Sequence, residues 1–160
     1  MTMLTMLPTK PVLLVLESLP RGLPKGSPAL PLGSRWFADA CRAWAVPAAM
    51  LAVTTRINCA DSKEEISWYG ARDRVSAALA AHQPEVVVAA GSVARDAVRA
   101  ALSLAPLPWS KGVVCGRGLG PAKVVAIPHF SGRSRVMNEA AERAAASKAL
   151  LDALTGRLAA

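Results

Sequence analysis

One stretch decides the fold of this chain: Glu85-Val86-Val87-Val88-Ala89-Ala90-Gly91-Ser92-Val93-Ala94. Its apolar run, 86–90, does not alternate with polar residues, which is typical of a strand buried on both faces of a parallel sheet. Gly91 and Ser92 interrupt the run, and apolar positions then repeat at helical spacing as far as Leu102. We expect Ser92 to be the N-cap of this helix. The stretch therefore predicts a strand followed at once by a helix, the repeating unit of an open α/β sheet.

Similar units flank this one on both sides. Apolar runs of strand length alternate with segments of helical spacing along the chain. With right-handed crossovers, this order predicts an α/β fold, a three-layer α/β/α sandwich on a four-stranded parallel sheet. The further predicted strands are 11–16, 50–54 and 123–127, and the further helices are 34–46, 67–82 and 136–158.

Length and charge set the broad class of protein. The 160 residues are enough for one domain, which we expect to span 1–160 with a flexible segment at 1–10. The net charge is +8 and the isoelectric point is near 10.1. Such a charge favours a polyanionic partner, with nucleic acid as the first candidate, although a basic solvated surface is the plainer alternative.

The cysteines and the apolar runs exclude several classes of protein. Cys41, Cys59 and Cys115 lack the spacing of a zinc site, and an iron–sulfur cluster needs four thiolates. We expect reduced thiols in a cytoplasmic protein, with no cofactor and no metal. The apolar run 12–16 is too short for a signal peptide or a membrane span, so we expect no membrane partner. For the oligomeric state we expect a monomer.

Polar side chains gather where the predicted strands end. The carboxyl ends of parallel strands meet at one edge of the sheet, where open α/β sheets bind their ligands. The last loop at this edge, 128–135, places a titratable ring beside two arginines. The loops that we expect there are 17–33, 55–66, 91–92 and 128–135, and they carry Glu17, Asn58, Ser92 and His129.

Four segments resemble, in the right order, motifs of the uracil-DNA glycosylase superfamily, and the resemblance covers roughly residues 11–150. The most specific is Pro128-His129-Phe130-Ser131-Gly132-Arg133-Ser134-Arg135, which is similar to the family's His-Pro-Ser-Gly-Arg-Asn-Arg motif. Leu16, Ser18 and Phe130 stand where the family usually has glycine, alanine and proline, and these departures concern the substrate more than the chemistry. The other segments are Val15-Leu16-Glu17-Ser18-Leu19-Pro20, similar to a Gly-Glu-Ala-Pro turn; Arg56-Ile57-Asn58, at the place of a base-reading asparagine; and 86–94, similar to the family's strand-glycine-helix start.

The resemblance implies a monofunctional DNA glycosylase, a hydrolase that flips a base out of the stack and leaves an abasic site. The transition state carries positive charge on the sugar and negative charge on the departing base. His129 would donate a hydrogen bond to the base O2, and Asn58 would pair with the polar edge of the base. Glu17 would orient water or balance the charge of the sugar.

Other residues at this edge would hold the DNA. Arg133 is the candidate wedge for the vacated stack, with Val136 or Met137 as alternatives. The flipped base would stack on Trp36 or Phe130, and Ser92 would bind a phosphate at the helix N-terminus. Trp68 and Trp109 border the predicted cleft or pack against its loops. The strand would be held by Ser131, Gly132, Arg133 and Arg135.

The excised base is expected to be uracil or a 5-modified pyrimidine. Strict uracil enzymes of the family place a bulky aromatic after the proline of the first motif, whereas Pro20 is followed by Arg21 and Gly22. We therefore expect a pocket that admits 5-substituted pyrimidines, including the glucosylated hydroxymethylcytosine of phage DNA. Antiviral defence and ordinary uracil repair both fit this expectation.

Plainer interpretations remain open. His129 and Asn58 are also explained as turn residues, and Glu17 as a solvated strand end or the partner of an arginine. A non-catalytic nucleic-acid-binding α/β domain would explain the charge without catalysis, and a flavodoxin-like domain would explain the sheet edge alone. Convergence of His129, Asn58 and Glu17 on one base-sized pocket would support the enzyme, and side chains that face different ways would count against it.

Overall fold

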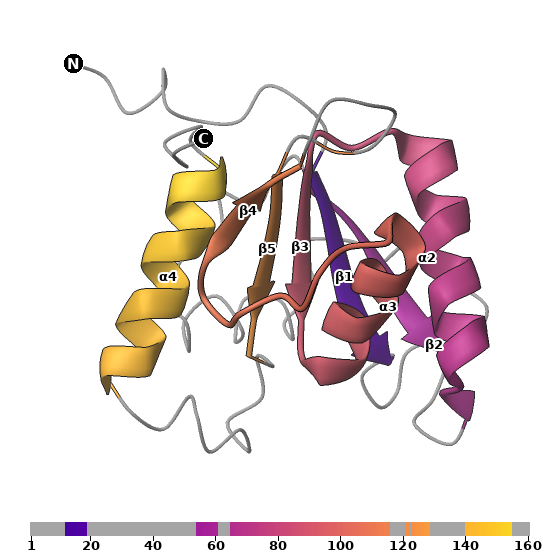
Figure 1. The fold of residues 1–160 in the computed structure, drawn as a ribbon, viewed down its shortest axis with the longest axis horizontal. Helices are drawn as coiled ribbons and strands as arrows, with labels where there is room; N and C mark the ends of the chain where they lie inside the picture. Colours follow the sequence, from indigo (N-terminus) through magenta and orange to yellow (C-terminus); the bar gives the residue numbers. More distant parts are fainter. Residues whose placement is uncertain are drawn as a thin grey trace.

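The computed structural model describes residues 12–18, 54–60, 65–115, 121, 123–128 and 140–154. These residues form a mixed α/β fold in which helices lie on both sides of one sheet (Figure 1). The strands are β1 (Val12–Ser18), β2 (Thr54–Ala60), β3 (Val86–Ala90), β4 (Gly112–Val114) and β5 (Lys123–Ile127), and the helices are α2 (Trp68–His82), α3 (Ser92–Leu102) and α4 (Ala140–Leu154).

The sheet has five strands in the order β2-β1-β3-β5-β4. The first four are parallel, and their register places Leu14 between Arg56 and Val88. β3 lies at the centre, and each of its residues is buried, as its unbroken apolar run predicts. The predicted four-stranded parallel sheet is wrong in one respect, because β4 adds a fifth strand that runs antiparallel to β5.

β4 lies in a segment that the sequence predicts to be loop. The chain reverses at Ser110, whose φ of 57° is left-handed, and the backbone N–H of Ser110 donates to the carbonyl oxygen of Ala126 over 2.8 Å. Trp109 forms an isolated parallel bridge with Ala126, and β4 then pairs with β5. A strand of three residues is too short to produce a sequence pattern, so only the free edge of β5 explains why it forms.

The two faces of the sheet bury separate cores. One face, which includes Leu14, Leu16 and Val88, packs against Ala146 and Leu150 of α4. The opposite face, which includes Leu13, Val15 and Val87, packs against α2 and α3 through residues such as Val75 and Val98. Figure 1 shows α4 apart from α2 and α3, with the sheet between them. Among the described residues, no helix is long and apolar enough to cross a membrane.

The boundaries of several elements agree with the sequence, whereas those of β2 do not. The predictions for α2, β3 and β5 are confirmed to within one residue at either end. β2 begins at Thr54, where the predicted strand ends, so Asn58 lies within a strand and not on a loop. β1 likewise extends through Glu17 to Ser18. Pairing between β1 and β2 explains both shifts. Each strand satisfies the backbone N–H and C=O groups of the other, so both strands continue through residues whose polar side chains predict a loop.

Candidate functional site

The carboxyl ends of β1 and β3 form the point where the direction of the chain switches. From β1 the chain continues to β2 on one side, whereas from β3 it continues to β5 on the other side. Loops that leave in opposite directions open a crevice, and open α/β sheets bind ligands at this position. Glu17 at the end of β1, Gly91 after β3, and Pro128 after β5 all lie at this edge.

Glu17 contacts the N-terminus of α3. The backbone N–H of Val93 donates to Glu17 Oε1 over 3.3 Å, a contact between residues 76 positions apart in the sequence. The N-cap of α3 is Gly91, which offers no side-chain acceptor, so the carboxylate of Glu17 satisfies one of the unpaired donors of the helix. Its negative charge also complements the positive end of the helix dipole.

Ser92 is therefore not the N-cap, and that prediction is wrong. It is the first residue of α3, and its side chain is exposed. A chain that caps the helix with a carboxylate from β1 has no need of a hydroxyl there. Because that carboxylate lies against the helix N-terminus, it would also repel a phosphate at this position.

Gly91 connects three strands at this edge. Its φ of 95° and ψ of 165° fall in a region that glycine alone occupies readily. Its N–H donates to the carbonyl oxygen of Ile127 over 2.9 Å, and its carbonyl accepts from the N–H of Arg95 over 2.9 Å. A Cβ at this position would collide with the carboxylate of Glu17. Gly91 thus fixes how β1, β5 and α3 approach one another.

Asn58 is the polar residue that the fold buries completely among the described residues. Neither its Nδ2 nor its Oδ1 has a hydrogen-bond partner within the part of the chain that the structure describes. A buried amide without partners costs about 1–3 kcal/mol, so a protein retains one only for a reason. An amide that offers both a donor and an acceptor is what pairing with the polar edge of a base requires.

Glu17 and Asn58 lie on neighbouring strands but on opposite faces of the sheet. Asn58 is paired with Leu16, which belongs to the core under α4. Glu17 lies beside Cys59 and reaches α3, on the other face. The structure therefore brings the two side chains to one edge of the sheet without turning them toward each other, which favours a structural role for Glu17.

Cys59 is the neighbour of Glu17 on β2, and its thiol is a poor nucleophile at neutral pH. Burial raises the pKa of its thiol to about 12, and the charge of Glu17 adds to this effect while Arg74 opposes it. A thiol with so high a pKa is protonated at neutral pH and is a poor nucleophile. We therefore assign Cys59 to the core. Among the described residues, no cluster of three or more histidine, cysteine, aspartate or glutamate side chains could hold a metal ion.

The remaining predicted site residues lie outside the described part of the chain. The last described residue before His129 is Pro128, which is buried, and Ile127 before it accepts the hydrogen bond from Gly91. β5 therefore ends at the same carboxyl edge of the sheet as β1 and β3. The predictions that lie outside the described residues concern Trp36, His129, Phe130, Ser131, Gly132, Arg133 and Arg135.

The two other tryptophans near the expected cleft differ in environment. Trp109 is partly buried, and the guanidinium of Arg95 lies 4.0 Å from its ring centroid, so it packs against α3. Trp68, at the first position of α2, is 53% exposed. The sequence offered both interpretations for each residue, and only Trp68 leaves its ring available to a partner.

The sequence did not reveal the roles of Gly91 and of the Glu17 cap. A glycine between a buried strand and a helix that lacks an acidic first turn was the available signal. No family model and no curated protein matches the chain.

Proposed function

We propose that the chain is a DNA glycosylase that flips out a pyrimidine base and hydrolyses its N-glycosidic bond. The observation that carries this proposal is the buried amide of Asn58, which has no partner among the described residues. It lies near the carboxyl edge of β2, beside the switch point of the sheet. A base that entered there would receive the hydrogen bonds that the amide lacks.

The proposed mechanism divides the work between two side chains. Asn58 holds the polar edge of the flipped base, which fixes the orientation of the base while the C1′–N bond breaks. His129, one residue beyond the buried Pro128, donates a hydrogen bond to the O2 of the departing anion. The C1′–N bond breaks and the base leaves with the bonding electrons, while the oxygen of water forms a bond to C1′. The water then loses one proton, and the departed base gains one. The net charge of +8 attracts the polyanionic substrate.

Glu17 has a supporting role in this proposal. Its carboxylate binds Val93, and it faces away from Asn58. It therefore sets the position of α3 and Gly91 at the edge of the site and does not serve as the residue that orients water. This assignment revises the sequence-based expectation that Glu17 acts in the chemistry.

The base is proposed to be uracil or a 5-modified pyrimidine, with the glucosylated hydroxymethylcytosine of phage DNA as the bulkiest candidate. The absence of a bulky aromatic residue directly after Pro20, where Arg21 and Gly22 follow, supports this choice. Repair of uracil and defence against phage both follow from the same reaction, and they differ only in which base enters.

A second candidate is a non-catalytic nucleic-acid-binding domain. The opposite orientation of Glu17 and Asn58 favours it, because the carboxylate is already used by the fold. In that case Asn58 would read a base without breaking a bond, and no abasic site would appear.

The test is release of the base from DNA. Duplexes and single strands that contain uracil, hydroxymethyluracil or glucosylated hydroxymethylcytosine are incubated with the protein, and abasic sites are then cleaved with alkali. We expect cleavage of at least one substrate, and we expect Asn58→Ala and His129→Ala to abolish it while Lys148→Ala, on the exposed face of α4, retains it. Full activity of both site variants would refute the assignment, and binding without any cleavage would favour the second candidate.

A further inference from the structure

The first turn of α2 presents two adjacent aromatic side chains to solvent. Trp68 is 53% exposed and Tyr69 is 66% exposed. Their rings meet edge to face, with centroids 4.7 Å apart and planes at 85°. Large exposed apolar side chains that cluster, in contrast to single ones, indicate an interaction surface. The proposed mechanism gives this aromatic pair no role.

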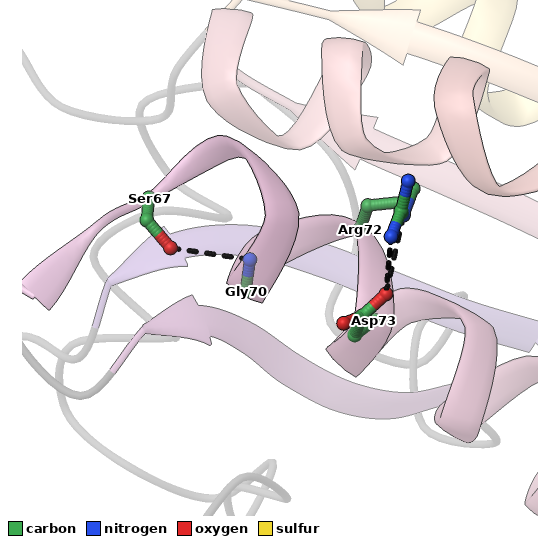
Figure 2. A network of polar contacts seen from close by, with 4 residues as sticks. All are labelled: Ser67, Gly70, Arg72 and Asp73. Carbon is green, nitrogen blue, oxygen red and sulfur yellow. Dashed lines mark hydrogen bonds and ion pairs between the residues drawn. The ribbon is translucent and has the colours of Figure 1, made fainter.

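Arg72 holds this pair in place. Its guanidinium carbon lies 5.3 Å from the ring centroid of Trp68 and 5.1 Å from that of Tyr69. Its Nε and Nη2 donate to Asp73 Oδ1 over 3.1 Å and 3.0 Å, so the guanidinium plane is fixed from the other side. Figure 2 shows Arg72 and Asp73 paired on α2. The two aromatic rings and the cation thus form one preorganised unit.

The start of α2 is capped by a neighbouring side chain. Ser67 is the N-cap, and its Oγ accepts from the N–H of Gly70 over 3.1 Å (Figure 2). No acidic residue occupies the first turn of α2, so the positive end of its dipole remains available. Because α2 follows β2, its N-terminus lies at the same carboxyl edge of the sheet as Asn58.

Trp68 lines a groove between α2 and α3. The larger hollow has a volume of about 430 Å³ and is lined by Trp68 together with Asp96, Arg99 and Ser103 of α3 and the following turn. A second hollow of about 160 Å³ shares Trp68 and Asp96 with it and continues toward Val93 at the start of α3. The larger volume falls within the range of about 300–1,000 Å³ that small-molecule sites occupy.

We propose that Trp68, Tyr69 and Arg72 form a stacking surface for the bases of single-stranded DNA next to the flipped nucleotide. Exposed aromatic rings bind single strands because every base has a π-face, and a neighbouring arginine adds a cation–π contact. The groove beside Trp68 receives the edge of the stacked base. This inference rests on the proposed function, from which it takes both the DNA partner and the flipped nucleotide.

Charge distinguishes DNA from an acidic or an apolar protein partner. The chain carries a net charge of +8, which favours a polyanion. Two acidic side chains near the aromatic pair are already matched, because Asp73 binds Arg72 and Asp96 lies 3.7 Å from Arg95. A phosphate backbone can therefore approach the rings without meeting an unpaired carboxylate among these residues.

The test is the affinity of the full chain for a fluorescein-labelled oligothymidylate, measured by anisotropy at fixed low salt. We expect Trp68→Ala to weaken binding about tenfold, since one stacked base is lost, and Trp68→Phe to retain most of the affinity. Tyr69→Ala should act in the same direction. Because these side chains are exposed, the variants should keep the wild-type circular dichroism spectrum.

Two controls separate stacking from general effects. Val114→Ala removes an exposed apolar side chain from β4, and Lys148→Ala removes an exposed cation from α4. Both should bind within about twofold of wild type, since neither side chain lies near the aromatic pair. Equal losses in the controls and in Trp68→Ala would show that only net charge matters, and the inference would be overturned.

The outcomes separate this inference from the proposed function. Unchanged binding by Trp68→Ala and Tyr69→Ala, with base release that depends on Asn58, would overturn the stacking surface and leave the glycosylase standing. Weakened binding by both variants, with no base released from any substrate by wild type, would support the stacking surface and refute the enzyme. An affinity loss accompanied by a higher KM for base release in Trp68→Ala would support both.

Discussion

Glu17 and Asn58 are two polar residues near the same edge of the sheet, and they differ in whether the described residues bond their side chains. The carboxylate of Glu17 accepts a hydrogen bond from Val93 and faces α3. The amide of Asn58 is fully buried on the other face, and no described residue bonds it. The first side chain is already used by the fold, and the second is available. Of two candidate site residues, the one that no described residue bonds is therefore the better candidate for contact with a ligand.

The largest expected effect concerns the glycine that Glu17 touches. Gly91→Ala forces a side chain into a backbone conformation that favours glycine and against the Glu17 carboxylate. We expect the free energy of unfolding to fall by about 3 kcal/mol. Urea denaturation followed by circular dichroism measures this change.

Gly70→Ala is the matched control, because it is the same substitution in the first turn of the neighbouring helix. The new Cβ would lie 2.7 Å from Ser67 Oγ, so the cap must rotate away. The helix propensity of alanine offsets this loss, and we expect a net change within about 1 kcal/mol. Equal losses for both variants would mean that Gly91 has no special position.

Asn58→Leu tests the other half of the comparison with two readouts that should move in opposite directions. Replacing a buried amide that has no partner among the described residues by an apolar side chain of similar size should raise the free energy of unfolding by about 1 kcal/mol, or the Tm by about 3 °C. Release of the base should fall at least about a hundredfold, which corresponds to about 2.7 kcal/mol.

A loss of stability in Asn58→Leu would contradict this account. It would indicate that the amide is bonded within the folded chain and that its role is structural, like that of Glu17. Asn58→Asp provides a further check, since a buried carboxylate at this position should destabilise the fold strongly.

Glu17→Ala should have a smaller effect on stability. It removes a helix cap and a favourable charge at the start of α3, which together contribute about 1–2 kcal/mol. Glu142→Ala, in the first turn of α4, is the control and should cost less than about 1 kcal/mol. Under the present assignment, base release per folded molecule stays within about threefold of wild type in Glu17→Gln. A loss of activity at unchanged stability would make Glu17 catalytic.

The smallest effect reports the contact between Glu17 and its neighbour on β2. The pKa of Cys59 is raised to about 12 by burial first and by the charge of Glu17 second. Since the folded-state pKa lies above the ordinary thiol pKa of 9.0, the stability that the protonated thiol contributes is complete below about pH 9 and is lost as the pH rises toward 12. Glu17→Gln should lower this pKa, measured from thiolate absorbance. An unchanged titration of Cys59 would place Glu17 away from β2.

The sequence predicts the local parts of this structure and misses those that depend on distant partners. The run from Val86 to Ala90 and the helical spacing after it need no other segment to be recognised, and they are confirmed. β4 forms because β5 has a free edge, and β2 includes Asn58 because β1 pairs with it. Neither cause is visible in the segment itself.

The same limit applies to the site. The motifs place Glu17, Asn58 and the start of the His129 loop at one edge, and the strand order agrees with that position. The face that each side chain takes follows from a one-residue difference in register between β1 and β2, which sequence patterns do not determine. For this reason the sequence identified Asn58 and Glu17 alike, whereas the structure separates them.

The cap on α3 has a consequence for the order in which the molecule folds. The acceptor for Val93 lies 76 residues earlier in the chain, so the start of α3 is completed only after β1 has docked beside β3. We therefore expect the first amides of α3 to exchange with solvent through global unfolding, and not through fraying of the helix end. In Glu17→Ala the same amides should exchange much faster, while those of α2, which is capped locally by Ser67, should keep their protection. Formation of this helix end would then report completion of the sheet.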